Sequence, residues 1–151
     1  MSQENVQVVR RYFAAIIRGA DSYREGARSI AGAPKADDLE ADGGQVLDRL
    51  HPDVRWKNVL GLVFEGKRDC TRAVDELMEA SQYYSVTLDE VTDLGGDRVL
   101  AIKEVSMRGQ NSAAAATLKV FSVLTVRAGL ITSADEYLNR EDALAAVSPS
   151  A

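Results

Sequence analysis

The first residue whose type and position suggest chemistry is an acid near the C-terminal end of the chain. Residues 130–138 read as a strand, and strand alternation places Asp135 on one face together with Ser133 and Tyr137. An apolar environment raises the pKa of a carboxyl group, which suits the group to general acid or base catalysis. Because Asp135 and Glu136 are adjacent acids, one of them has to face outward, so a solvated Asp135 is the alternative.

A second acid lies in residues 98–108, which also read as a strand. Alternation places Glu104 on the face that carries Leu100, Ile102 and Ser106. A carboxylate among apolar side chains is costly to bury without a partner, which favours a functional role. An ion pair of Glu104 with a basic neighbour is the alternative interpretation.

Several other kinds of site lack the residues that they need. The chain contains one His and one Cys, so a zinc site built from several such ligands and an intrachain disulfide are both excluded. No glycine-rich phosphate loop, serine-hydrolase elbow or zincin motif is present. A Cys70–His51 dyad has no supporting spacing, since Cys70 opens a predicted helix and His51 precedes Pro52. We therefore expect neither a metal nor a cofactor.

The elements that must position these acids follow from the periodicity. The pattern predicts helices over 5–19, 45–50, 69–83 and 140–147, and strands over 54–59, 84–94, 98–108, 117–126 and 130–138. Residues 20–44 are rich in Gly and acidic residues and read as a long loop insertion. Helices followed by a meander of long antiparallel strands predict a single α+β domain over residues 1–151.

Composition restricts the partners. The 151 residues carry a formal net charge of −5 with 46% hydrophobic residues, as an ordinary soluble protein does. An acidic chain lacks the basic surface that binds nucleic acid or an anionic membrane. The N-terminus has no apolar segment of a signal peptide, and no apolar run reaches the ~20 residues of a membrane span. We expect a cytoplasmic protein.

Five segments, taken together and in order, resemble a known family. They are Val8–Phe13, Leu50–Trp56, Phe64–Asp69, Asp93–Val99 and Tyr137–Leu144. The chain resembles the SnoaL-like branch of the NTF2-like superfamily, which includes polyketide cyclases, ketosteroid isomerases, limonene-type epoxide hydrolases and catalytically silent binding domains. The resemblance implies a cone in which a curved antiparallel sheet wraps around N-terminal helices and encloses one apolar cavity.

The resemblance also implies roles for individual residues. With Trp56 facing the cavity, Asn58 becomes its neighbour on the same strand face. Tyr12 stands at a place resembling the phenol that donates to the oxyanion in ketosteroid isomerases, with a half-buried core tyrosine as the alternative. Asp135 matches the position of the last-strand base of polyketide cyclases. Ser106 is a further polar donor, and the expected apolar and aromatic contacts to substrate are Tyr137, Leu118 and Val120.

Differences between this chain and the residue patterns of the family's enzymes help to distinguish the possible activities. Asn58 holds the place of the ketosteroid isomerase base and cannot abstract a proton, so that activity is disfavoured. Trp56, Asn58 and Asp135 match three positions of the epoxide hydrolase set, but Glu104 and Ser106 replace its Arg and second Asp.

The polyketide-cyclase interpretation asks least of the sequence. We therefore expect a cofactor-free enzyme that cyclises or isomerises a hydrophobic, oxygenated, polyketide-like small molecule by acid–base chemistry. Asp135 would be the base, with Glu104 as a second acid and Asn58 as a donor. The alternatives are epoxide hydrolysis or opening, and a non-catalytic domain that binds a lipophilic ligand.

One surface of the sheet is expected to mediate assembly. Alternation places an apolar set on the face away from the cavity: Val99, Ala101, Val105, Met107, Phe121 and Val123. Exposed apolar patches of this kind mark interfaces. The sequence therefore predicts a homodimer through this face.

Overall fold

The first helix, α1, spans Ser2–Arg24 and packs along one face of the sheet. The computed structural model describes residues 2–24, 48–109 and 115–147. Val9 and Phe13 are buried on the side that faces the sheet, whereas Arg10 and Arg11 are exposed. The helix continues past Gly19, so the expected loop insertion over 20–44 begins too early, and its residues 25–44 lie outside the described part of the chain.

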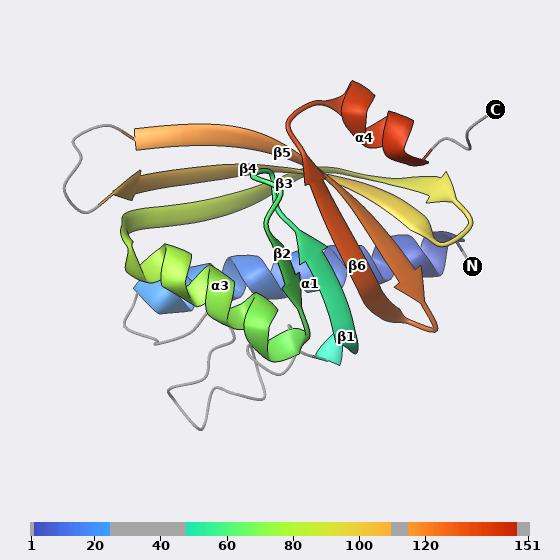
Figure 1. Ribbon diagram of the computed structural model, residues 1–151, viewed down its shortest axis with the longest axis horizontal. Helices are drawn as coiled ribbons and strands as arrows, with labels where there is room; N and C mark the ends of the chain where they lie inside the picture. The colour runs from blue at the N-terminus through green and yellow to red at the C-terminus, as the bar shows by residue number, and fades with distance from the viewer. Residues whose placement is uncertain (1, 25–47, 110–114, 148–151) are drawn as a thin grey trace.

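The sheet has six strands and is curved but not closed (Figure 1). Its order is β2-β1-β6-β5-β4-β3. The strands are β1 Leu50–Lys57, β2 Val63–Glu65, β3 Ser81–Gly95, β4 Arg98–Gly109, β5 Ala115–Arg127 and β6 Leu130–Tyr137. All neighbours pair antiparallel except β1 and β6, which pair parallel. The expected curved, mainly antiparallel sheet is present, and β1 adds one parallel pairing because it joins the sheet beside the last strand.

Two shorter helices complete the described part of the fold. Helix α3 spans Lys67–Glu79, and α4 spans Arg140–Val147. The predicted helix over 69–83 runs too far, since the chain enters β3 at Ser81. Helices α1 and α3 lie on one side of the sheet, which we call the inner face, and α4 packs on the opposite, outer face (Figure 1). No helix in the described ranges is long and apolar enough to cross a membrane.

Helices pack on both faces of the sheet, so residues of β4 are buried on either side of it. Ala101 is buried on the inner face in the cluster of α1, whereas Leu100 and Ile102 are buried on the outer face with Ala143 of α4. The strand face shared by Leu100, Ile102 and Glu104, which was expected to carry a functional acid, therefore lies away from the cavity. The predicted grouping of alternate residues holds, but the choice of the face turned toward the cavity is reversed on this strand.

Because helices pack on both faces of the sheet, the apolar surface that was expected to form a dimer is not exposed. Val99 and Ala101 are fully buried inside the protomer, and Val105 and Val123 are buried as well. Met107 and Phe121 are only partly exposed and pack against two different core clusters, one on each side of the sheet. These six residues therefore form no exposed apolar face, and the homodimer stays a prediction without the surface that suggested it.

Candidate functional site

A pocket of about 410 Å³ opens between the inner face of the sheet and helices α1 and α3. Ligand pockets are typically ~300–1,000 Å³, so this one fits a small organic molecule. Its wall is mostly apolar and includes Ile16, Leu50, Val54, Val74, Val86, Val105, Val120, Leu124 and Ile131. The polar lining groups are few, so each of them constrains what the pocket can bind.

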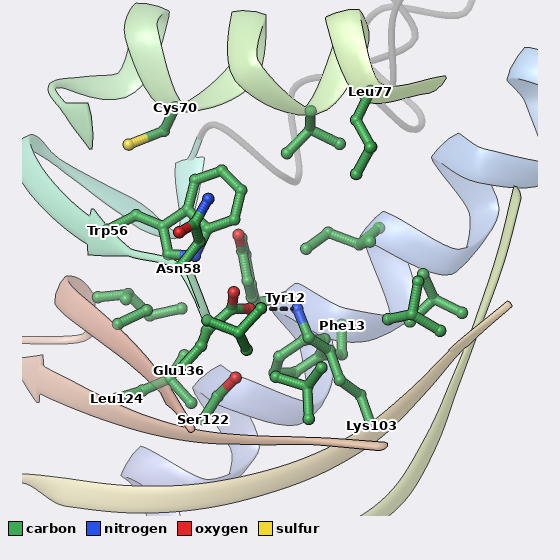
Figure 2. A pocket seen from close by; sticks show the side chains of 18 of the residues that line it. Tyr12, Phe13, Trp56, Asn58, Cys70, Leu77, Lys103, Ser122, Leu124 and Glu136 are labelled. Atoms are coloured by element: carbon green, nitrogen blue, oxygen red, sulfur yellow. Dashed lines mark ion pairs between the residues drawn. The ribbon is translucent and has the colours of Figure 1, made fainter. Parts of the chain in front are cut away.

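The main polar feature is an ion pair between Lys103 of β4 and Glu136 of β6. Lys103 Nζ lies 2.7 Å from Glu136 Oε2, and the two side chains are only 16% and 7% exposed. Both line the pocket, and Figure 2 shows the pair beside Tyr12. Lys103 Nζ also lies 5.6 Å from the centroid of the Phe13 ring, within range of a cation–π contact.

The Glu136 carboxylate holds the Lys103 side chain in its charged form. Burial by itself lowers the pKa of Lys103, but the Glu136 carboxylate and the nearby Tyr84 phenol outweigh it and raise that pKa above its ordinary value. An isolated charge in this apolar wall would be strongly disfavoured, whereas a hydrogen-bonded pair is tolerated. The pocket therefore contains an acceptor carboxylate and a donor ammonium side by side.

Two tyrosines add neutral donors to the same wall. Tyr12 of α1 and Tyr84 of β3 both line the pocket. Burial, together with the negative charge of Glu136, raises the pKa of Tyr12, and burial raises the pKa of Tyr84. Both phenols therefore keep their protons at neutral pH. The expected place of Tyr12 in the cavity agrees with the structure, and its oxyanion role stays a prediction.

Strand β1 and the turn after it bring Trp56 and Asn58 to the pocket, as expected (Figure 2). The Trp56 ring lies against Phe64, with 5.1 Å between the ring centroids. Asn58 Oδ1 accepts hydrogen bonds from the backbone N–H groups of Leu60 and Leu62, each at 3.0 Å. Because these bonds occupy the amide oxygen, the NH₂ group of Asn58 is the one suited to donate to a ligand.

Asp135 does not line the pocket, and its expected orientation is wrong. Arg55 Nη1 donates to Asp135 Oδ1 at 3.0 Å on the outer face. Glu136, expected on the far face, is the residue of this pair that points inward. The physical reason is register: β6 lies between β1 and β5, and Ala134 and Glu136 share the side that carries Trp56 and Leu124.

Three further predicted site residues also lie outside the pocket. Glu104 alternates with Lys103 on β4 and falls on the outer face, so the second acid is misplaced. Ser106 Oγ lies 3.0 Å from Thr117 Oγ1, a cross-strand contact away from the cavity. Tyr137 packs against the cluster under α4. All three follow from the reversed choice of face described above.

The mouth of the pocket carries exposed leucines. Three leucines line the pocket and are also exposed to solvent. The exposed fraction is 37% for Leu118, 80% for Leu60 and 37% for Leu77. Val120, by contrast, is buried deeper along β5. The expected lining positions of Leu118 and Val120 agree with the structure. An apolar ligand would therefore meet leucine side chains on entry.

Sequence reasoning missed Lys103 and the inward placement of Glu136. A usable signal was present, because Lys103 is a lone charge on a strand face otherwise made of Val99, Ala101, Val105 and Met107. A single charge on an apolar face needs a partner of opposite sign when that face is buried. Within residues 2–24, 48–109 and 115–147, no group of His, Cys, Asp and Glu side chains is arranged to hold a metal ion.

Cys70 of α3 lines the pocket but is a poor nucleophile. Burial and the neighbouring Asp69 raise the pKa of the Cys70 thiol to about 11. We expect iodoacetamide to alkylate the folded protein at neutral pH about a hundredfold more slowly than a free cysteine, with the rate rising with pH up to that value. Mass spectrometry reads this one site, since Cys70 is the chain's single cysteine. Alkylation as fast as that of free cysteine would contradict the assignment.

The comparisons with known proteins agree with this geometry. The chain matches the SnoaL-like domain family over residues 37–134. No curated protein matches the sequence. Among solved structures, an NTF2-like protein from Burkholderia thailandensis E264 superposes with a TM-score of 0.67 at 18% identity, covering 96% of this chain and 98% of that one.

Two other solved structures carry chemical descriptions. A protein from Jannaschia sp. CCS1, provisionally described as a SnoaL-like polyketide cyclase, gives a TM-score of 0.65 at 15% identity, covering 99% of this chain and 94% of that one. TerC, co-crystallised with polyporic acid, superposes with a TM-score of 0.65 at 16% identity, covering 94% of this chain and 96% of that one. At these identities the likeness shows the fold alone, whereas the family match spans most of the sequence. The chain belongs to the SnoaL-like domain family and has an NTF2-like fold.

Proposed function

We propose that this protein binds a hydrophobic, oxygenated small molecule in the inner pocket and moves a proton next to its carbonyl group, giving an isomerised or cyclised product. The observation that carries the proposal is the buried Lys103–Glu136 pair in an otherwise apolar pocket of about 410 Å³. Side chains that can exchange protons are costly to bury, and their gathering in a cavity favours function over packing.

Glu136 takes the role of general base that the sequence pattern predicted for Asp135. Its carboxylate removes a proton from the carbon beside the substrate carbonyl, and the C–H electron pair becomes the enolate. Returning the proton to another carbon gives an isomer. Attack of the enolate carbon on a second carbonyl carbon of the substrate closes a ring and breaks the π bond of that C=O group, and Glu136 returns its proton to the alkoxide oxygen that forms. The Lys103 contact occupies only part of the carboxylate's acceptor capacity, since two oxygens provide about four lone-pair sites.

Donors beside Glu136 stabilise the negative charge that develops on the carbonyl oxygen. The Lys103 ammonium group and the Tyr12 phenol both line the pocket next to the carboxylate. Groups aimed at developing charge in a water-poor site contribute more than they would in water. Asn58 can donate to a second oxygen through its NH₂ group.

The likenesses support the class of substrate. TerC was crystallised with polyporic acid, and the Jannaschia protein carries a polyketide cyclase description, so the fold accommodates oxygenated ring compounds. The epoxide alternative required Asp135 to hold water beside Asn58, and the outward position of Asp135 removes that support. A non-catalytic binding domain is the second candidate, favoured by the mutual neutralisation of Lys103 and Glu136.

Two measurements on the same protein distinguish an enzyme from a binding domain. The chain has a single tryptophan, and Trp56 lines the pocket, so its fluorescence reports ligand entry. The probe is 2-tetralone, a small apolar ketone whose exchange of protons beside the carbonyl is followed by proton NMR in D₂O. We expect both a change in Trp56 fluorescence and exchange faster than in buffer. Binding with exchange at the buffer rate would support the binding domain and contradict the enzyme.

A further inference from the structure

Lys103 and Glu136 are the charged side chains among the described residues that line the pocket. Their charges cancel, so the lining formed by the described residues is neutral as a whole. A neutral ligand leaves this balance unchanged. An anionic ligand that reaches Lys103 places a second carboxylate against one ammonium group, which leaves one uncompensated negative charge in an apolar wall.

We propose that Glu136 sets the charge of the ligand: the pocket prefers neutral carbonyl compounds, and an acid binds only with uptake of one proton. The inference rests on the proposed binding function of the pocket and adds its specificity. The side chains of Lys103 and Glu136 are 16% and 7% exposed, so water screens little of the extra charge. A proton shared between Glu136 and the ligand carboxylate restores neutrality and is the least costly solution.

The other titratable groups around the pair do not obscure this effect. Tyr12 approaches from α1, Tyr84 from β3 and Cys70 from α3. Burial raises the pKa of each tyrosine and that of Cys70, so all three stay neutral between pH 6 and 8. Strands β1 and β5 contribute neutral side chains such as Trp56 and Ser122. Within that pH range a change in binding therefore reports on Glu136, Lys103 and the ligand.

The test uses two ligands of equal shape, 4-tert-butylbenzoate and 4-tert-butylbenzamide, with binding followed by Trp56 fluorescence. For the native protein we expect the Kd of the amide to be flat from pH 6 to 8. The Kd of the acid should rise about tenfold per pH unit, as the uptake of one proton requires. This series needs no variant, so it tests the proposal even if a substitution disturbs folding. A pH-independent Kd for the acid would overturn the proposal.

A substitution then identifies the responsible group. Glu136→Gln removes the competing carboxylate and leaves Lys103 to pair with the ligand, so the acid should bind at least about tenfold tighter at pH 8. The Kd of the amide should change little, so the preference should invert from the amide to the acid. The matched control is Glu90→Gln, because Glu90 pairs with Arg140 and does not line the pocket. An unchanged acid-to-amide ratio in Glu136→Gln would contradict the assignment.

The outcomes also separate this inference from the proposed function. If neither ligand changes Trp56 fluorescence, the pocket binds no molecule of this class, and both proposals fail. If both bind with the same affinity at every pH, only the charge preference fails. Exchange of 2-tetralone is measured independently of either result.

Discussion

Glu136→Gln is expected to lower the exchange of protons beside the 2-tetralone carbonyl by about 10²–10⁴-fold, the usual contribution of a positioned acid–base group. Glutamine keeps the shape of the side chain and can still accept a hydrogen bond from Lys103, but it cannot take a proton from carbon. Binding of 2-tetralone, a neutral ligand, should change little. Parallel titration of Trp56 fluorescence and NMR exchange measures the two effects separately.

A comparison with Asp135→Asn decides between the two acids of β6. Asp135 pairs with Arg55 at 3.0 Å outside the pocket, so this substitution should leave most of the exchange rate intact. Glu90→Gln controls for the loss of any surface carboxylate. A large loss in Asp135→Asn with a normal rate in Glu136→Gln would return the catalytic role to the residue that the sequence favoured.

Lys103→Met is expected to destabilise the fold by about 3–5 kcal/mol, because it leaves the Glu136 carboxylate buried without its partner. Methionine fills much of the space of the lysine stem, so the loss reports mainly on charge. Urea unfolding followed by circular dichroism measures the change. The double variant Lys103→Met, Glu136→Leu should recover most of the stability, since an apolar pair needs no compensation.

Lys119→Met is the matched control on the neighbouring strand. Lys119 pairs with Asp89 at 3.7 Å, but its side chain is 55% exposed, so the expected cost is below about 1 kcal/mol. A cost for Lys103→Met as small as that of the control would show that the buried pair is not needed for stability.

Alkaline pH tests the same ion pair without a substitution. The pKa of Lys103 in the folded protein is raised above its ordinary 10.5. The stabilisation from its charge is therefore complete below about pH 10.5 and is lost as the pH rises through the higher folded-state value. The difference in stability between the native protein and Lys103→Met should narrow over that range.

Local pattern determined much of the fold. The sequence predicts strands over 117–126 and 130–138, and the short connection between them is a turn in which Ala128 and Gly129 have positive φ, 52° and 79°, as a tight hairpin requires. The long strands, the last helix and the family resemblance also followed from the sequence. Periodicity and turn residues act over a few positions, so a single chain read in order is enough to find them.

The sequence also determined which residues share a strand face. Trp56 was grouped with Asn58, and Glu104 with Ser106, and both groupings hold in the structure. A period of two fixes such sets whatever the rest of the chain does. Because Lys103 and Glu104 are adjacent in a strand, the sequence alone places their side chains on opposite faces of the sheet.

Only the tertiary structure decided which face is turned toward the pocket. Helix α4 covers the outer face over Leu100 and Ile102, while α1 covers the inner face over Ala101. Both faces of β4 therefore carry buried apolar residues, so the presence of apolar side chains alone does not identify the face turned toward the pocket. The parallel pairing of β1 with β6 and the meeting of Lys103 with Glu136 join residues far apart in the sequence. Such contacts depend on how the layers stack, so no local pattern of the chain encodes them.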